Sequence, residues 1–489
     1  MSEGIPTPKV NRTLRAPLSV VGVLLAATLT AGVLINHPES VSPNGSSHST
    51  HATNGVVSLA SRTTQGAVLV GSDGLVQVEL VLAAEEGKRE RSASGPGDLV
   101  VVLDRSGSMA GEKIDYARAA VLELVHQLGV QDRFALVTYS TDAEIRIPLS
   151  LATAGARSAW SHGIRSIGTG GQTNMSAGLD LAYQVISSSG SSSGAEGRFA
   201  RVVLISDGLA NHGDSSSEGL SMRARRIAER EDVLSTVGVG ADFNEYLMSA
   251  LADSGTGNYY FLESAHGLAE IFAKEFEATR ATVATAVAVT LEPGEGVEVV
   301  EAAGYPLERH VRQGRQLVFR PGTLFSGQER RLWVTYRIPA SEPGEFELGK
   351  IGVTYKDGGR EFHLGLDDVP KVACVRNEET FFASVDKETW EDSVVGEYYN
   401  RLQEEVAKDV REGRVEDAKA KIHSYRERQD SLNRVLKSAT VERNLGDVDA
   451  LAQEVEEAFR GPEQDEKRNE FSKTRQQAGR DGRRAGSKR

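Results

Sequence analysis

The chain contains one cysteine, Cys374, among 489 residues. A single cysteine excludes an intrachain disulfide, and we expect this one to be a buried small residue in a strand rather than a reactive thiol. The zinc-protease pattern His-Glu-x-x-His is also absent. There are 69 acidic residues against 56 basic ones, and the net charge of −13 argues against a nucleic-acid partner. The length predicts roughly two to four domains.

Charge is absent from residues 16–35, an apolar run of about 20 residues that is long enough to cross a hydrocarbon core of about 30 Å. Three basic residues precede this run, and the next one is Arg62. The positive-inside rule therefore places residues 1–15 in the cytoplasm and the rest of the chain outside, in the periplasm or at the cell surface. No Ala-x-Ala site follows the run, which favours an uncleaved, single-pass signal anchor. A cleaved signal would export the same domains.

Residues 99–111 read Leu-Val-Val-Val-Leu-Asp-Arg-Ser-Gly-Ser-Met-Ala-Gly, an apolar run that ends in one carboxylate and two hydroxyls. Such a run is typical of a central parallel strand, and ligand sites in parallel sheets lie at the carboxyl ends of the strands. Asp104, Ser106 and Ser108 alternate there, so their oxygens can face one point. Hard oxygen donors suit Mg²⁺, Mn²⁺ or Ca²⁺ rather than zinc.

Two later stretches carry further oxygen donors. Residues 168–178, Gly-Thr-Gly-Gly-Gln-Thr-Asn-Met-Ser-Ala-Gly, contain Thr173 in a glycine-rich loop that lacks the lysine of a phosphate-binding loop. Residues 202–208, Val-Val-Leu-Ile-Ser-Asp-Gly, predict a second buried strand, ending in Asp207. Together, Asp-Arg-Ser-Gly-Ser-Met, Gly-Gly-Gln-Thr-Asn and Ile-Ser-Asp-Gly-Leu-Ala-Asn closely resemble the metal-ion-dependent adhesion site of von Willebrand factor type A (VWA) domains. With the predicted anchor, the chain resembles the bacterial membrane-anchored members of this family.

The resemblance implies a divalent cation, with Mg²⁺ expected first and Mn²⁺ or Ca²⁺ as alternatives. By motif, its ligands are the two aspartates, which act directly or through water, and three hydroxyls: Asp104, Ser106, Ser108, Thr173 and Asp207. The family usually has Gly-Gly-Thr-Asn, whereas this chain has one more residue, Gln172, before the threonine. In the family, one coordination position is left for a carboxylate from a partner. The nearby His212 is interpreted as a polar loop residue, and Asn211 as a structural one.

Helical and strand patterns alternate between residues 97 and 279, and the last predicted helix covers 268–279. This alternation predicts an α/β domain with a doubly wound, mainly parallel sheet. From 280 to 376 the apolar period changes to two, which predicts a β-sandwich. Residues 67–96 begin with a predicted β-hairpin over 67–83, which we expect to complete the sandwich. The VWA domain would then be inserted into the sandwich, similar to the I-like and hybrid domains of integrin β chains.

The remaining segments are predicted from composition and periodicity. Residues 36–66 are rich in Ser, His, Asn, Thr and Gly, which predicts a flexible linker. Helical apolar spacing over 386–460 predicts a helical hairpin or short bundle. The polar, basic stretch 461–489 predicts a disordered tail.

These observations favour a membrane-anchored, extracytoplasmic binding protein, not an enzyme, whose VWA domain captures a partner protein through a divalent ion and an Asp or Glu of the partner. The alternative is a scaffold or regulatory subunit of an envelope complex, in which the metal only holds loops in place. A metal-dependent hydrolase is a third class. It lacks an evident general base, because Asp104 and Asp207 are both assigned to the ion. The sequence leaves the oligomeric state open.

Overall fold

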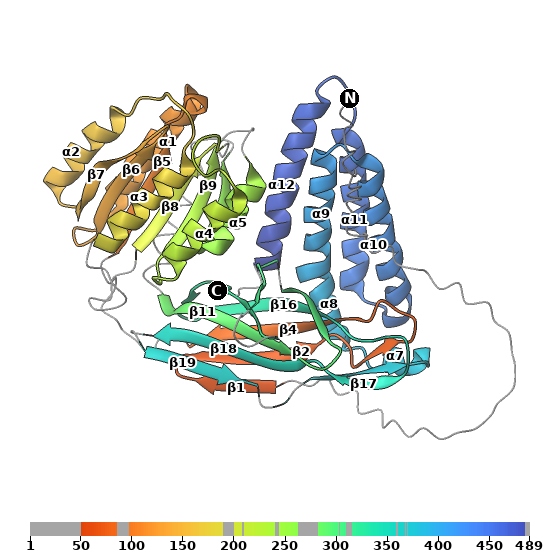
Figure 1. Cartoon of the computed structure of the whole chain (residues 1–489). Helices are drawn as coiled ribbons and strands as arrows, with labels where there is room; N and C mark the ends of the chain where they lie inside the picture. The colour runs from red at the N-terminus through yellow and green to blue at the C-terminus, as the bar shows by residue number, and fades with distance from the viewer. Residues whose placement is uncertain are drawn as a thin grey trace, which may run out of the picture. The chain divides into compact units, whose positions relative to one another are not determined.

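The computed structural model of the chain (Figure 1) describes residues 50–85, 97–188, 200–207, 210–239, 244–262, 282–302, 304–309, 315–357, 360–366, 368 and 370–484. The predicted membrane segment 16–35 and the predicted helix 268–279 lie outside these residues. Among the helices of these described ranges, none is both long and apolar enough to cross a bilayer.

A six-stranded sheet forms the centre of the VWA-like part of the chain (Figure 1). Its strands are β5 (Asp98–Asp104), β6 (Arg133–Tyr139), β7 (Ala143–Leu151), β8 (Ala200–Ser206), β9 (Val233–Val239) and β10 (Thr256–Leu262). Their order is β10-β9-β8-β5-β6-β7, and all neighbours pair in parallel except β6 and β7. The prediction of a mainly parallel sheet is therefore confirmed.

Helices cover both faces of this sheet, which explains why β5 is buried along its whole length. The helices are α1 (Glu112–Gln127), α2 (Ala154–Arg165), α3 (Met175–Ser188), α4 (Ser217–Ala228) and α5 (Glu245–Ser254), with a 3₁₀ turn, η1, at Gly107–Met109. Val101 and Leu103 of β5 belong to the core under α1 and α2, whereas Val100 and Val102 belong to the core under α3, α4 and α5. A strand buried on both faces needs apolar side chains at every position, as this one has.

Two further sheets pack on one shared hydrophobic core and form the predicted sandwich. One has the order β1-β2-β4-β16-β12, and the other β13-β14-β11-β18-β19, with β15 also paired to β11. In the first sheet, β1 is Thr50–Asn54, β2 is Val57–Thr63 and β4 is Leu75–Ala84. A small sheet, β17-β20-β3, completes this part, and Cys374 is buried on β20 as expected. The strands after the VWA-like part are β11 (Thr282–Pro293), β12 (Glu298–Ala302), β13 (Glu308–Arg309), β14 (Leu317–Phe319), β15 (Leu324–Phe325), β16 (Glu329–Arg337), β17 (Gly344–Glu347), β18 (Gly349–Asp357), β19 (Arg360–Gly365) and β20 (Lys371–Val375).

The strands before the VWA-like part complete the sandwich, but not as a hairpin. β4 (Leu75–Ala84) pairs with β16 along its length, so the VWA-like part is inserted between two strands of one sheet. β3 (Ala67–Leu69) pairs in parallel with β20 instead of with β4. The predicted hairpin over 67–83 is therefore wrong. The chain does turn between the two strands, because the N–H of Ser72 donates to the carbonyl of Leu69 at 3.1 Å and Gly71 between them has φ of +82°.

Residues 50–63, predicted as part of a flexible linker, form two strands. β1 (Thr50–Asn54) and β2 (Val57–Thr63) are antiparallel, and β2 pairs with β4. Every second residue of β2 is buried, but two of these inward residues are Ser61 and Thr63. The linker prediction is wrong here because small polar residues at inward positions hide the apolar period of two.

The C-terminal part is helical, as predicted for 386–460. It comprises α7 (Glu378–Ala383), α8 (Lys387–Ser393), a π-helical turn η2 (Val394–Tyr398), α9 (Tyr399–Arg411), α10 (Val415–Leu436), α11 (Ala439–Ala458) and α12 (Gln464–Arg484). The prediction of a disordered tail over 461–489 is wrong for residues 464–484, which form α12, while residues 485–489 lie outside the described residues. The glycines of α12 let it pack closely on α9, since a Cβ at Gly479 would lie 2.4 Å from the carbonyl oxygen of Asn400.

Candidate metal centre

The residues predicted to bind a metal lie at or near the carboxyl ends of the central strands β5 and β8. Asp104 is the last residue of β5, and Asp207 directly follows β8, the parallel neighbour of β5. Ser106 and Ser108 lie at the turn η1 after β5, with their hydroxyl oxygens 3.2 Å apart. Thr173 lies two residues before α3. The carboxyl ends of β5 and β8 thus present two carboxylates and two hydroxyls beside the loop that carries Thr173.

Asp104 is fully buried and held by two donors. The backbone N–H of Ser106 donates to Oδ1 at 2.8 Å, and the hydroxyl of Ser206 donates to Oδ2 at 2.7 Å. Burial raises the pKa of the Asp104 carboxyl, and these hydrogen bonds oppose that rise. The charge of Asp207 raises the same pKa, so the two carboxylates repel one another in a place where a cation would relieve the repulsion.

Asp207 is also buried, and its two oxygens differ in their partners. Oδ2 lies 3.1 Å from Nζ of Lys113, near the start of α1. Oδ1 is buried without a hydrogen-bond partner among the described residues. A buried carboxylate oxygen without a donor is costly, so this atom has the properties of a ligand for a cation.

Thr173 is buried and is fixed through its peptide groups. Its N–H donates to Oδ1 of Asn211 at 2.9 Å, while its carbonyl accepts from the N–H groups of Asn211 and His212 at 3.1 and 3.2 Å. The N–H of Gly107 donates to the carbonyl of Gly171 at 3.1 Å, which joins the glycine-rich loop to η1. The three loops that carry the candidate ligands are therefore bonded to one another.

This donor set fits a hard divalent cation. Two carboxylates and three hydroxyls supply oxygen only, and the four members other than Ser108 are at most 2% exposed. Within the described ranges, no cluster of three or more His, Cys, Asp or Glu side chains could hold a metal, so a site here depends on the hydroxyls. Ser108, Gly107 and Gly171 are exposed at the rim, so a bound ion would be accessible from solvent.

The sequence did not identify Ser206 or Lys113 as members of this centre. In the sequence, Ser206 is indistinguishable from any other position of a buried strand, although it directly precedes Asp207. Lys113 reads as an ordinary residue at the start of a helix. Asn211 was expected to be structural, and it does hydrogen-bond to the backbone of Thr173. His212 is an exposed loop residue whose N–H donates to the carbonyl of Thr173.

Comparison with known proteins identifies the class of this part of the chain. Residues 98–274 match the family model of the von Willebrand factor type A domain. The chain therefore contains a VWA domain, as the three motifs indicated.

Two of the similar curated proteins are bacterial. The chain is 32% identical over 215 residues to the uncharacterized protein YfbK of Escherichia coli, an alignment that covers 43% of this chain and 36% of YfbK. It is 25% identical over 311 residues to the uncharacterized protein sll0103 of Synechocystis sp., covering 62% of this chain and 71% of that protein. The chain thus spans little more than a third of the length of YfbK.

Among solved structures, the chain is similar to a von Willebrand factor type A protein from Catenulispora acidiphila, with a TM-score of 0.58 and 15% identity over 84% of this chain and 90% of that one. At this identity the likeness shows a shared fold.

Proposed function

We propose that this protein is a binding protein whose VWA domain captures a partner protein through a divalent cation held by Asp104, Ser106, Ser108, Thr173 and Asp207. The observation that carries the proposal is the set of oxygen donors at one sheet edge, with buried ligands beneath an exposed rim. Mg²⁺ is the expected ion. The VWA domain itself supports a role in protein–protein interaction.

The charge balance of the donors explains why a partner carboxylate would complete the site. Two aspartates supply two negative charges, and the three hydroxyls supply none. A divalent ion prefers about six oxygen ligands, so an ion in this setting retains affinity for a further anionic oxygen. An Asp or Glu side chain of a partner supplies such an oxygen.

A binding role is favoured over hydrolysis because the carboxylates have other partners. Both oxygens of Asp104 accept hydrogen bonds, and Oδ2 of Asp207 pairs with Lys113. Oδ1 of Asp207, which has no hydrogen-bond partner among the described residues, is assigned to the ion, so neither carboxylate serves as a general base. For location, we propose that residues 16–35 anchor the chain with its folded part outside the cytoplasm, a proposal that rests on the sequence.

The first test uses Asp104→Asn in the full-length protein, with Asp142→Asn as a matched control on an exposed carboxylate next to the site. Calorimetric titration with Mg²⁺ and Mn²⁺ should show binding to the wild type and the control, and a loss of at least about tenfold in affinity for Asp104→Asn. Equal affinity in all three proteins contradicts the proposed centre.

The second test concerns the partner. Proteins captured from an envelope extract by the wild type should be retained in Mg²⁺, released by EDTA and not captured by Asp104→Asn. A partner that stays bound in EDTA, while the thermal midpoint of the protein falls, supports the scaffold alternative with a structural metal.

A further inference from the structure

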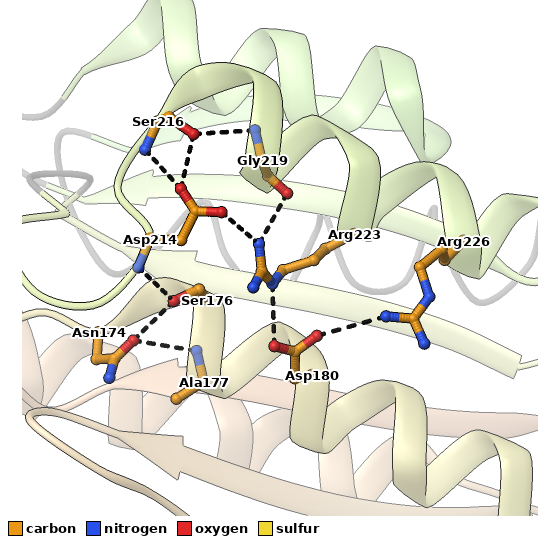
Figure 2. Close-up of polar contacts among 9 residues, drawn as sticks. All are labelled: Asn174, Ser176, Ala177, Asp180, Asp214, Ser216, Gly219, Arg223 and Arg226. Carbon is orange, nitrogen blue, oxygen red and sulfur yellow. Dashed lines mark hydrogen bonds and ion pairs between the residues drawn. The ribbon is translucent and has the colours of Figure 1, made fainter.

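Polar contacts connect the start of α3, the loop before α4 and α4 itself (Figure 2). Arg223 of α4 donates from Nη1 to Oδ2 of Asp214 at 2.8 Å and from Nε to Oδ2 of Asp180 on α3 at 3.0 Å. The planar guanidinium thus bridges two carboxylates from two elements, which a single ammonium cannot do with the same geometry. Asp214 also accepts from the N–H and the hydroxyl of Ser216 at 3.1 and 2.6 Å.

The same contacts continue to the residue after Thr173. The N–H of Asp214 donates to the hydroxyl of Ser176 at 3.1 Å, and that hydroxyl donates to Oδ1 of Asn174 at 2.8 Å. Asn174 in turn donates from its side chain to the carbonyl of Thr141 at 3.0 Å. Gly213 makes this approach feasible, because a Cβ there would lie 2.3 Å from Oδ1 of Asn174.

The loop held by Asp214 also carries Asn211, which contacts both peptide groups of Thr173. Thr173 is therefore fixed from two sides, through Asn174 along the chain and through Asn211 across the loop. Both routes meet at Asp214. Arg223 is the side chain from α4 that holds Asp214 in place.

From these contacts we infer that Arg223 and Asp214 are positioning residues for Thr173, and that they set the divalent-ion affinity of the centre from α4. The inference rests on the proposed function. Hydrogen bonds from Ser216 and Arg223 lower the pKa of Asp214, in agreement with a carboxylate that is ionised and held by its donors. Partners that orient a metal ligand commonly affect affinity although they do not touch the ion.

The test compares Arg223→Met with the wild type and with Arg226→Met in the full-length protein. Arg226 is the matched control, since it lies on the same helix, is 49% exposed and approaches Asp180 only at 3.8 Å. Arg223→Met should weaken Mn²⁺ binding by about tenfold. Because its ion pairs are partly exposed, its thermal midpoint in EDTA should fall by no more than about 4 °C. Arg226→Met should bind Mn²⁺ as the wild type does.

Two further measurements separate positioning from a general loss of stability. Hydrogen exchange of residues 168–178 should be faster in Arg223→Met, with exchange in β5 unchanged. Arg223→Lys should restore part of the affinity, because an ammonium can still donate to Asp214. Asp214→Asn combined with Arg223→Met should weaken binding no more than Arg223→Met alone, since both act through one contact.

The outcomes distinguish this inference from the proposed function. If the wild type binds no Mn²⁺, both the proposed function and this inference are contradicted. If the wild type binds and Arg223→Met binds equally well, only the inference is overturned. If Arg223→Met does not fold, the Mn²⁺ affinities of Arg223→Lys and Asp214→Asn test the inference instead. Unchanged affinity in both variants overturns the inference.

Discussion

Lys113 is the residue of the centre whose charge opposes a metal ion. Its ammonium lies 3.1 Å from Oδ2 of Asp207, whose side chain is 2% exposed. Two cations that share one carboxylate repel each other, and the repulsion is strong where little water screens it. Lys113→Met should therefore tighten Mn²⁺ binding by about tenfold, equivalent to about 1.4 kcal/mol, measured by calorimetric titration of the full-length protein.

Lys113→Arg is the control, because it keeps the charge beside Asp207 and should bind Mn²⁺ nearly as the wild type does. Weaker binding by Lys113→Met would contradict the prediction. That result would mean that Lys113 orients the carboxylate more than it repels the ion.

At the scale of residues, the candidate ligands could be predicted from the sequence because their spacing follows the ends of apolar runs. The extra residue Gln172 does not expel Thr173, which stays buried. The N–H of Gln172 donates to the hydroxyl of Thr141 at 3.1 Å, and Gln172 is exposed to solvent. Ser206 could not be predicted, since its partner Asp104 lies 102 positions away and only the fold brings them together.

At the scale of elements, the opposite edge of the VWA sheet carries a carboxylate that titrates near neutrality. Asp232 precedes β9 and accepts from the N–H of Ala200, the first residue of β8, at 2.8 Å. Burial raises the pKa of Asp232 to about 7, although the contacts with Ala200 and Arg230 oppose this. The folded protein therefore keeps a proton on Asp232 up to about pH 7, whereas the unfolded chain releases it near pH 4.

This raised pKa predicts a pH dependence of stability. Between about pH 4 and pH 7 the folded state binds more protons than the unfolded state, so stability falls as the pH rises. Asp232→Asn removes this contribution. Relative to the variant, the wild type should lose about 2 kcal/mol in free energy of unfolding between about pH 5 and pH 7, measured by urea denaturation. Parallel pH profiles for the two proteins would contradict the assignment.

The elements of the VWA domain could be predicted well because each strand or helix is long enough to show its period. α3, for example, covers Met175–Ser188, inside the stretch 97–279 in which helical and strand patterns were predicted to alternate. Pairing could not be predicted in the same way. β3 has three residues, and its partner β20 lies about three hundred positions further along the chain. The predicted hairpin indicated a turn between β3 and β4, but not which strands the two then join.

At the scale of the whole molecule, α12 shows how a polar segment can be an integral part of a fold. Its buried residues include Lys473, Gln476, Arg480 and Arg483 beside the apolar Phe471. Composition alone predicts disorder for such a segment, because burying its charges requires acidic partners. Those partners are Asp253 of α5 for Arg480, and Glu301 of β12, Glu397 of η2 and Glu404 of α9 for Arg483. β1 and β2 are likewise part of the sandwich, so a fragment that keeps the described fold must include residues 50–484.

Arg483 provides the most direct test of this arrangement. Its side chain is 4% exposed and pairs with Glu397 of η2, from Nε to Oε2 at 2.9 Å, and with Glu301 of β12. Removing one member of a buried ion pair leaves an uncompensated charge. Arg483→Met should therefore destabilise the C-terminal helices by about 3–5 kcal/mol. Hydrogen exchange of residues 464–484, followed by mass spectrometry, should accelerate accordingly.

Arg460→Met is the matched control, because Arg460 is 73% exposed and its ion pair with Glu456, across one helical turn, contributes little energy. Adding Glu397→Gln to Arg483→Met should recover part of the loss, since the second change removes the unpaired charge. If exchange over 464–484 is already fast in the wild type and unaffected by Arg483→Met, the segment is the disordered tail that its composition predicts. In that case the ion pairs with Glu397 and Glu301 do not hold it.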